Sequence, residues 1–215
     1  PAAEVPELLR ELGRHRQEQA AKGDDERYAW QRQALQALRE FVERPPRALE
    51  PFLLGAPCGA GKTRWMRLAV EALLHADGAR CFVLVVHERA MQDQVHDEWH
   101  ADLPVLRLGN GHHDAPRPGS VLVAVQHSVG ELLEGGRCAL PDAPLVLLLD
   151  EADLYRIHLW DRGAGDEECE ALPGEGDEGD EAEAAPARRK RWQDIRAVAR
   201  RAQLCIAVSA THDVP

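Results

Sequence analysis

The feature that most constrains the fold of this 215-residue chain is a nine-residue stretch, GAPCGAGKT at positions 55–63. It follows a short apolar run at 51–54 and precedes a segment in which apolar residues recur at helical spacing. From Ala56 onward it fits the relaxed pattern of a phosphate-binding loop, in which a small residue and four others precede Gly-Lys-Thr. In such a loop, backbone N–H groups and the N-terminus of the following helix surround a polyphosphate. Position 56 departs from the strict pattern, because it carries alanine where glycine is usual.

The loop pattern assigns roles to individual residues. It predicts that Lys62 reaches the β- and γ-phosphates of a nucleotide and that the hydroxyl of Thr63 holds Mg²⁺. The residues expected to bind the nucleotide at this loop are Pro57, Cys58, Gly59, Ala60, Gly61, Lys62 and Thr63.

Two carboxylates directly follow the apolar run LVLLL at 145–149. A run of this kind is typical of a strand that is buried on both faces, so the carboxylates stand at its end. In a phosphate-loop enzyme we expect Asp150 to hold Mg²⁺ through water, complementing Thr63, and Glu151 to orient or deprotonate the attacking water. The alternative is that acidic residues simply end a strand at the surface, and the phosphate loop earlier in the chain argues against it.

Short apolar runs alternate along the chain with segments of helical periodicity. The runs predict strands at 81–86, 105–108, 121–125, 145–149 and 204–208. The periodic segments predict helices at 6–22, 26–42, 64–74, 89–100, 129–134 and 192–201, with a loop at 109–119. This alternation predicts the α/β class, a doubly wound parallel sheet with helices on both faces and ligands at the carboxyl ends of the strands. The expected organisation is a pair of N-terminal helices at 1–50 and a sheet domain at 51–215.

The formal net charge of −11 is concentrated in one segment. Residues 161–187 carry 11 acidic side chains and one arginine, a net charge of −10, so the remaining chain is close to neutral. This segment has almost no large apolar residues and buries too little surface to offset the entropy of ordering, so we expect a disordered acidic insert. The basic cluster at 188–191 that follows either pairs with the insert, contacts phosphates or begins a solvated helix.

The cysteines and histidines show no spacing typical of a metal site. The five cysteines, at 58, 81, 138, 169 and 205, include no Cys-x-x-Cys pair, which favours unpaired thiols in a reducing compartment and argues against structural zinc. Among the ten histidines, the His112/His113 and His96/His100 pairs are expected to be solvated surface side chains. No run of 18 apolar residues occurs and the N-terminus is too polar for a secretory signal, so the expected location is cytoplasmic, with no membrane partner.

Three segments, taken in order, resemble a known family. PCGAGKT at 57–63, LLLDEAD at 147–153 and SAT at 209–211 are similar to motifs I, II and III of superfamily 2 helicases and translocases. The resemblance extends from Tyr28 to Thr211 and corresponds to the first of the two RecA-like lobes of these proteins. It implies a P-loop NTPase of DEAD/DEAH-box-like type that uses ATP and Mg²⁺, closest in character to the DNA helicases of restriction and repair systems. The acidic insert accounts for the long interval between motifs II and III.

The resemblance also implies a nucleotide contact upstream of the phosphate loop. WQRQAL at 30–35 is similar to the family's glutamine motif, which implies that Gln31 reads the adenine edge, with Trp30 or Tyr28 packed near the base. Gln33 is a competing candidate, and a plain surface glutamine on a helix is the alternative.

Nucleic-acid contacts are implied at the ends of two other strands. VVHERAMQDQ at 85–94 is similar to motif Ia, which implies that Arg89 contacts phosphate; His87 and Glu88 replace the family's Pro-Thr pair, and a plain strand-to-helix turn is the alternative. VAVQHSV at 123–129 is similar to motif Ic, which implies that Gln126 and Ser128 contact the sugar-phosphate backbone, or else that Ser128 caps the next helix.

Motif III is implied to couple the two sites. The hydroxyls of Ser209 and Thr211 would hydrogen-bond the motif II carboxylate Asp153 and so connect the nucleotide site to the nucleic-acid face.

The resemblance implies an ATP-dependent helicase or translocase lobe with Glu151, Lys62 and Asp150 as catalytic residues. DNA is favoured over RNA, because the flanking motifs lack the Pro-Thr-Arg-Glu-Leu pattern of the RNA-directed DEAD-box proteins. We expect a second RecA-like lobe with an arginine finger in the same or a partner chain, because this chain stops directly after motif III. The isolated lobe should therefore hydrolyse ATP poorly and unwind no duplex. The alternative function is a P-loop regulatory or scaffold module that binds ATP without remodelling nucleic acid.

Overall fold

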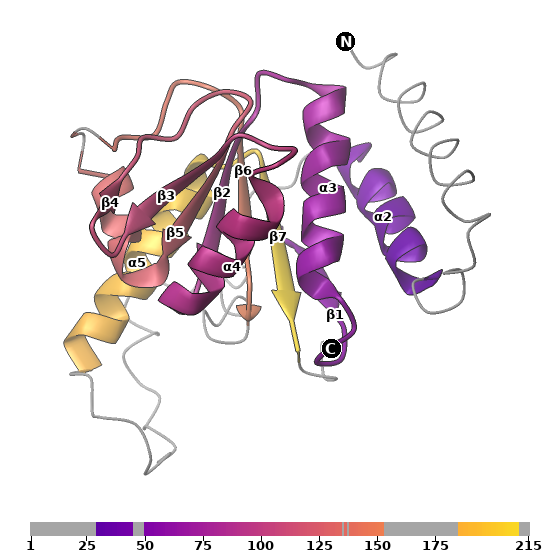
Figure 1. The fold of residues 1–215 in the computed structure, drawn as a ribbon, viewed down its shortest axis with the longest axis horizontal. Coiled ribbons are helices and arrows are strands. Elements are labelled where there is room, and N and C mark those ends of the chain that lie inside the picture. The colour runs from indigo at the N-terminus through magenta and orange to yellow at the C-terminus, as the bar shows by residue number, and fades with distance from the viewer. Residues whose placement is uncertain (1–28, 45–49, 135, 137, 153–184, 211–215) are drawn as a thin grey trace.

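The computed structural model describes residues 29–44, 50–134, 136, 138–152 and 185–210. Several predictions concern residues outside these ranges, namely the helix at 6–22, most of the acidic insert, Tyr28, Asp153 and Thr211. The described residues form a seven-stranded sheet with helices on both faces (Figure 1).

The sheet has the strand order β1-β7-β6-β2-β5-β3-β4. Every neighbouring pair is parallel except the last, in which β4 runs antiparallel to β3. Because β7 and β6 lie between β1 and β2, the chain must cross over the sheet, and the predicted α/β class with a doubly wound parallel sheet is confirmed. The strands are β1 (Phe52–Gly55), β2 (Cys81–Val86), β3 (Val105–Gly109), β4 (His112–His113), β5 (Val121–Val125), β6 (Leu145–Leu149) and β7 (Leu204–Ser209).

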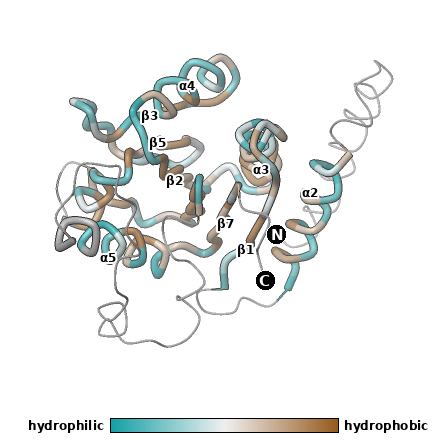
Figure 2. The backbone as a smooth tube through the Cα atoms, turned by 90° about the horizontal axis from the view of Figure 1, so that it is seen from below, coloured by the Kyte–Doolittle hydropathy of each residue, from teal (hydrophilic) through white to brown (hydrophobic). Residues whose placement is uncertain are grey.

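The helices cover the two faces of the sheet in separate groups. Figure 2 shows α3 and α4 on one side of the strands and α5 on the other. The first group comprises α2 (Ala29–Val42), α3 (Lys62–Ala76) and α4 (Arg89–Trp99), and the second comprises the 3₁₀ helix η1 (Gln126–Leu132) and α5 (Ala185–Arg201).

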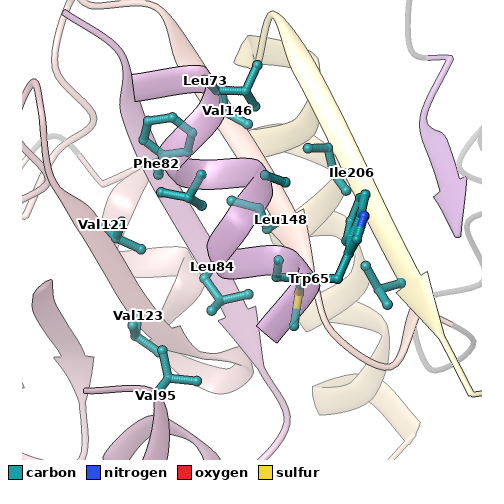
Figure 3. Packing of buried hydrophobic residues seen from close by; sticks show 14 of the residues in the cluster. Trp65, Leu73, Phe82, Leu84, Val95, Val121, Val123, Val146, Leu148 and Ile206 are labelled. Atoms are coloured by element: carbon teal, nitrogen blue, oxygen red, sulfur yellow. The ribbon is translucent and has the colours of Figure 1, made fainter. Parts of the chain in front are cut away.

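The central strand β2 shows why its sequence is apolar throughout. Alternate side chains enter the two hydrophobic clusters, so that Phe82 and Leu84 pack beneath α3 while Val83 and Val85 pack on the side of η1 and α5. Figure 3 shows the first of these clusters, in which α3 lies over the sheet. A strand that is covered on both faces needs an apolar residue at every position.

Three aromatic rings hold α2 and α3 against β1. Trp65 of α3 is fully buried and stacks on Phe52 of β1, with ring centroids 6.0 Å apart and planes inclined by 15°. Phe41 of α2 meets Phe52 edge-on at 5.6 Å and 71°. The strand and the helix that flank the phosphate loop are therefore fixed relative to each other directly behind the loop.

The structure corrects three of the predicted boundaries. β4 lies within the expected loop at 109–119, and its two residues are too few to give an alternating pattern. The 3₁₀ helix η1 begins at Gln126, earlier than the helical turn expected at 129–134. α5 begins at Ala185, so the last three residues of the insert predicted at 161–187 belong to a helix that was expected to start at 192. Pro186 is compatible with this start, because proline is tolerated in the first turn of a helix.

The turn between β3 and β4 is built from three left-handed residues. Gly109, Asn110 and Gly111 have φ values of 96°, 53° and 86°. Gly109 also lacks room for a side chain, because a Cβ there would lie 2.6 Å from the Oγ of Ser128. Only glycine therefore meets both requirements at position 109.

We expect Gly109→Ala to destabilise the fold more than Gly111→Ala. Both variants force an alanine into the left-handed region, at a cost of about 1–2 kcal/mol. A Cβ at position 111 meets no atom within 4 Å, whereas at position 109 it overlaps Ser128. The overlap should add about 1–3 kcal/mol, the usual cost of overpacking. Urea unfolding of the two variants measures the difference, and equal losses would contradict the steric explanation.

Candidate functional site

The phosphate loop connects the end of β1 to the start of α3. Its turn is set by Gly59 and Gly61, which have φ values of 74° and 87°. The carbonyl of Gly61 accepts the hydrogen bond of the Trp65 N–H at 3.0 Å, which begins the helix. The N-terminus of α3 therefore begins at the loop, where the positive end of its dipole favours an anion.

Lys62 and Thr63 are the first two residues of α3, and both are half-buried. The Nζ of Lys62 donates to the carbonyl oxygens of Ala56 and Pro57, at 3.2 and 3.5 Å. The ammonium group thus bends back over the loop, where it stands beside the position that a phosphate would take.

Asp150 directly follows β6 and is only 4% exposed. Its N–H donates to the carbonyl of Val85 at 3.1 Å, which fixes it at the carboxyl end of β2 and β6. Burial is the main cause that raises the pKa of the Asp150 carboxyl above its ordinary value, and the charge of Glu151 raises it further. A hydrogen bond from the Glu151 N–H, at 3.1 Å, and the charge of Lys62 lower this pKa in part. Lys62 and Glu151 therefore both act electrostatically on Asp150.

Glu151 is exposed and adopts a left-handed backbone with φ of 52°. A non-glycine residue in this region carries strain, and such strain is common where a side chain must be aimed for function. The turn takes Glu151 out of the line of β6, so that its carboxylate is solvent-accessible while Asp150 is enclosed.

Ser209, the last residue of β7, lies beside the start of the phosphate loop. It pairs with Gly55 in the sheet, and its carbonyl accepts the N–H of Ala56 at 3.1 Å. The side chain is nearly inaccessible, with 4% of the residue exposed. Its two predicted partners in motif coupling, Asp153 and Thr211, lie outside the described residues.

Gln31 is brought to the same place by α2. It is 3% exposed, and its Nε2 donates to the carbonyl of Gly61 at 3.1 Å. The competing candidate Gln33 is exposed on another side of α2. The structure thus places Gln31, and not Gln33, beside the phosphate loop, although the contact of Gln31 with Gly61 had no signal in the sequence.

The candidate nucleic-acid residues differ in how exposed they are to solvent. Arg89, the first residue of α4, has a side chain that is 70% exposed and lies 3.5 Å from Asp93. Gln126 donates to the carbonyl of His87 at 3.5 Å, which joins the ends of β5 and β2. Ser128 is 5% exposed, so it is not available to a ligand in this conformation, and its place inside η1 also excludes the predicted capping role.

One polar residue of structural importance was not predicted. Gln92 of α4 is fully buried, and its Nε2 donates to the carbonyls of Leu108 and Val123 at 2.8 Å each. Its Oε1 accepts a longer bond of 3.4 Å from Asn110. A polar residue on an amphipathic helix normally indicates the solvent side, so this role of Gln92 had no signal in the sequence.

The phosphate loop, the buried Asp150 and the exposed Glu151 all follow the carboxyl ends of parallel strands. This arrangement defines a phosphate-loop α/β lobe of the helicase type. Residues 25–152, more than half of the chain, match the family described as "Type III restriction enzyme, res subunit". The chain belongs to this family, and the resemblance to a helicase or translocase lobe is confirmed. No curated protein matches the chain.

Solved structures similar to this chain include three helicase-type proteins. They are the yeast DEAD-box splicing factor Prp28 (17% identity, TM-score 0.44, 77% of this chain and 38% of that one), S. cerevisiae Dbp5 bound to RNA and ADP BeF3 (17%, 0.46, 84% and 40%), and the DUF1998 helicase MrfA (15%, 0.48, 99% and 30%). The chain spans less than half the length of each of them.

The cysteines and the helices bear on two further expectations. No disulfide joins the cysteines among the described residues, of which Cys58 alone is exposed. None of the helices within the described ranges has the length and apolar character needed to cross a membrane.

We expect Asp150→Asn to stabilise the nucleotide-free chain by about 0.5–2 kcal/mol, the common range for stabilising substitutions. The variant removes a buried charge, while its amide oxygen can still accept the Glu151 N–H. A carboxyl whose pKa is raised by folding costs stability wherever the pH is high enough to ionise it in the unfolded chain. The gain should be absent below the ordinary aspartate pKa of about 3.9, grow as the pH rises through the higher pKa of folded Asp150, and then stay constant.

Urea unfolding of both proteins at a series of pH values measures this gain. Asp142→Asn, at an exposed aspartate, is the matched control and should bring no gain. A gain at Asp150 that is the same at every pH would show that the buried charge is not its cause.

We expect Gln31→Glu to weaken ATP binding about tenfold or more, because a carboxylate cannot donate to the Gly61 carbonyl and a lost bond to a buried group costs about 1–3 kcal/mol. Gln33→Glu makes the same change of charge on the exposed side of α2 and should leave the affinity unchanged. Titration calorimetry with ATP and with GTP measures both effects. A larger loss for ATP than for GTP adds adenine recognition to the role of Gln31, and equal affinities of the two variants would contradict its role at the loop.

Proposed function

We propose that this chain is the ATP-binding lobe of an ATP-dependent nucleic-acid helicase or translocase of superfamily 2. The observation that carries the proposal is the arrangement around Asp150: a buried carboxylate that responds to the charge of Lys62 on one side and stands beside an exposed Glu151 on the other. A module that only binds a nucleotide has no need of a second, accessible carboxylate at this place.

The donor set fits Mg²⁺. The hydroxyl of Thr63 and the carboxylate of Asp150 offer the hard oxygen atoms that this ion prefers. The raised pKa of Asp150 also supports a cation here, because burial leaves its negative charge only partly compensated by Lys62. When bound, the ion would offset the negative charge of the phosphates.

Each residue then has a distinct task in ATP hydrolysis. The loop N–H groups and Lys62 bind the phosphates, for which the ammonium group exchanges its two carbonyl acceptors for phosphate oxygens. Glu151 orients the attacking water and accepts its proton. Gln31 holds the loop through Gly61 and, being 3% exposed, would read the adenine edge only after its side chain turns outward. The hydroxyls of Ser209 and Thr211 would hydrogen-bond Asp153 and so couple the nucleotide site to the nucleic-acid face, and the backbone of Ser209 is bonded to the loop at Ala56.

Nucleic acid would run along the ends of β2 and β5. Arg89 offers an exposed guanidinium for phosphate, and Gln126 is bonded to the carbonyl of His87, two residues before Arg89 in the sequence. Ser128 would join them only after η1 moves. The description of the matched family, a restriction enzyme subunit, supports DNA rather than RNA as the polymer.

Turnover would require a second RecA-like lobe in the same or a partner chain. An arginine finger from such a lobe is worth roughly 10³- to 10⁵-fold in phosphoryl transfer, so residues 1–215 alone should bind ATP but turn it over slowly. The lobe described here would then comprise helices at 1–50 and the sheet domain at 51–215.

We expect Lys62→Ala and Glu151→Gln to separate binding from chemistry. Lys62→Ala should abolish MgATP binding to this chain, because the phosphates lose their cation. Glu151→Gln should retain binding but lower nucleic-acid-stimulated turnover by roughly 10²- to 10⁴-fold in a protein that also contains the second lobe. Glu98→Gln, at an exposed glutamate on α4, is the control and should match the unchanged protein.

Calorimetry with MgATP and a phosphate-release assay with and without single-stranded DNA or RNA measure these effects. The proposal fails if Glu151→Gln turns ATP over at the normal rate. ATP binding without any response to nucleic acid would instead favour the regulatory or scaffold module.

A further inference from the structure

Three potential metal ligands meet at the β4 edge of the sheet. The Nδ1 of His113 lies 3.2 Å from the Oε2 of Glu131, and the Sγ of Cys138 lies 3.4 Å from the carbonyl oxygen of His113. The ligand atoms of all three side chains, one nitrogen, one oxygen and one sulfur, lie within 4.8 Å of one another.

The three residues come from different parts of the fold. His113 belongs to β4 and pairs with Leu108, Glu131 lies in η1, and Cys138 follows η1. Glu131 and Cys138 lie 18 and 25 positions after His113 in the sequence, so no short ligand motif marks the three residues. His113 and Glu131 have side chains that are 58% and 36% exposed, whereas Cys138 is buried at 5%.

This geometry is close to that of a tetrahedral zinc site. Zinc bonds of about 2.0–2.3 Å place any two ligand atoms roughly 3.4–3.6 Å apart. The His113–Glu131 distance of 3.2 Å already approaches this value. The remaining separations, at most 4.8 Å, need a movement on the order of 1 Å, which side-chain rotation at an accessible edge can supply.

We propose that His113, Glu131 and Cys138 form a Zn²⁺ site that ties β4 to η1, with water as the fourth ligand. Thiolate and imidazole select Zn²⁺ over Mg²⁺ and Ca²⁺, which prefer oxygen ligands alone. A surface ion pair beside a buried thiol is the alternative reading of the same three side chains, and metal titration distinguishes the two.

The position of the site suggests what the metal does. β4 is a two-residue strand at the edge of the sheet, and main-chain pairing alone holds it weakly. The metal joins it to η1, which begins at Gln126 and carries the Ser128 that packs against Gly109. The site is therefore structural, and it lies at the opposite edge of the sheet from β1 and the phosphate loop. It does not depend on the proposed function.

Titration of the chain with Zn²⁺, after removal of metal by a chelator, tests the proposal. We expect one equivalent to bind and to raise the melting temperature, because the ion binds the folded state. His113→Ala, Glu131→Gln and Cys138→Ser should each weaken binding at least about tenfold, the smallest effect usual for groups that support a metal site. Cys58→Ser and His112→Ala remove a thiol and an imidazole outside the cluster and should bind as the unchanged chain does.

Co²⁺ provides a spectroscopic check on the ligands. The chain should show a thiolate-to-cobalt charge-transfer band, which Cys138→Ser abolishes and Cys58→Ser preserves. Glu131→Gln changes an accessible side chain, so it tests the site even if Cys138→Ser disturbs the fold. Urea unfolding of both variants shows whether each of them is folded.

Three results would overturn the zinc site. The first is the absence of a bound equivalent in the unchanged chain. The second is a Cys138→Ser variant that still binds the metal and still shows the thiolate-to-cobalt charge-transfer band. The third is binding that is lost in His100→Ala, because the stacked rings of His96 and His100, 5.3 Å apart on α4, would then hold the ion.

Discussion

The parallel pairing of β1 with β7 is the contact on which the nucleotide site depends. Gly55 lies opposite Ser209, and the next N–H, of Ala56, donates to the Ser209 carbonyl. β7 in turn pairs with β6, whose end carries Asp150. Because main-chain hydrogen bonds fix these strands in register, the phosphate loop and the acidic pair lie at the same carboxyl end of the sheet. The stack of Trp65 on Phe52 fixes the helix that follows the loop.

The buried carboxylate of Asp150 costs folding stability. Asp150 is enclosed among apolar strands next to a second carboxylate, and both circumstances raise its pKa. Lys62 offsets only part of this, since its ammonium group is also bonded to two loop carbonyls. Buried charge of this kind lowers the stability of a fold and is found mainly where a function requires it. The sheet can tolerate the cost because its two apolar clusters lie directly behind the edge.

The sequence predicted those parts of the structure that follow from local pattern. β2, β5 and β6 match the predicted ranges because strands buried on both faces are continuous apolar runs bounded by polar residues. The phosphate loop and the acidic pair were predicted because their chemistry requires fixed spacing within one segment. β4 was missed because two residues carry no periodicity, and the group of His113, Glu131 and Cys138 because its members meet only through the fold. Ser128 of η1 is buried against Gly109, a residue of β3 that is distant in the sequence, so the motif around Ser128 could not reveal its burial.

The two ends of the sheet are held by different kinds of bond. Around the nucleotide loop the strand ends are joined by parallel main-chain pairing. At the opposite edge β4 pairs with β3 over two residues only, whereas β3 pairs with β5 over four, and the side chain of Gln92 adds bonds to the carbonyls of Leu108 and Val123. Each such bond contributes about 0.5–1.5 kcal/mol, so a few of them can exchange partners at a modest cost. The side chain of Gln92 therefore supplements the main-chain pairing near the edge of the sheet where β4 adds only two residues of its own.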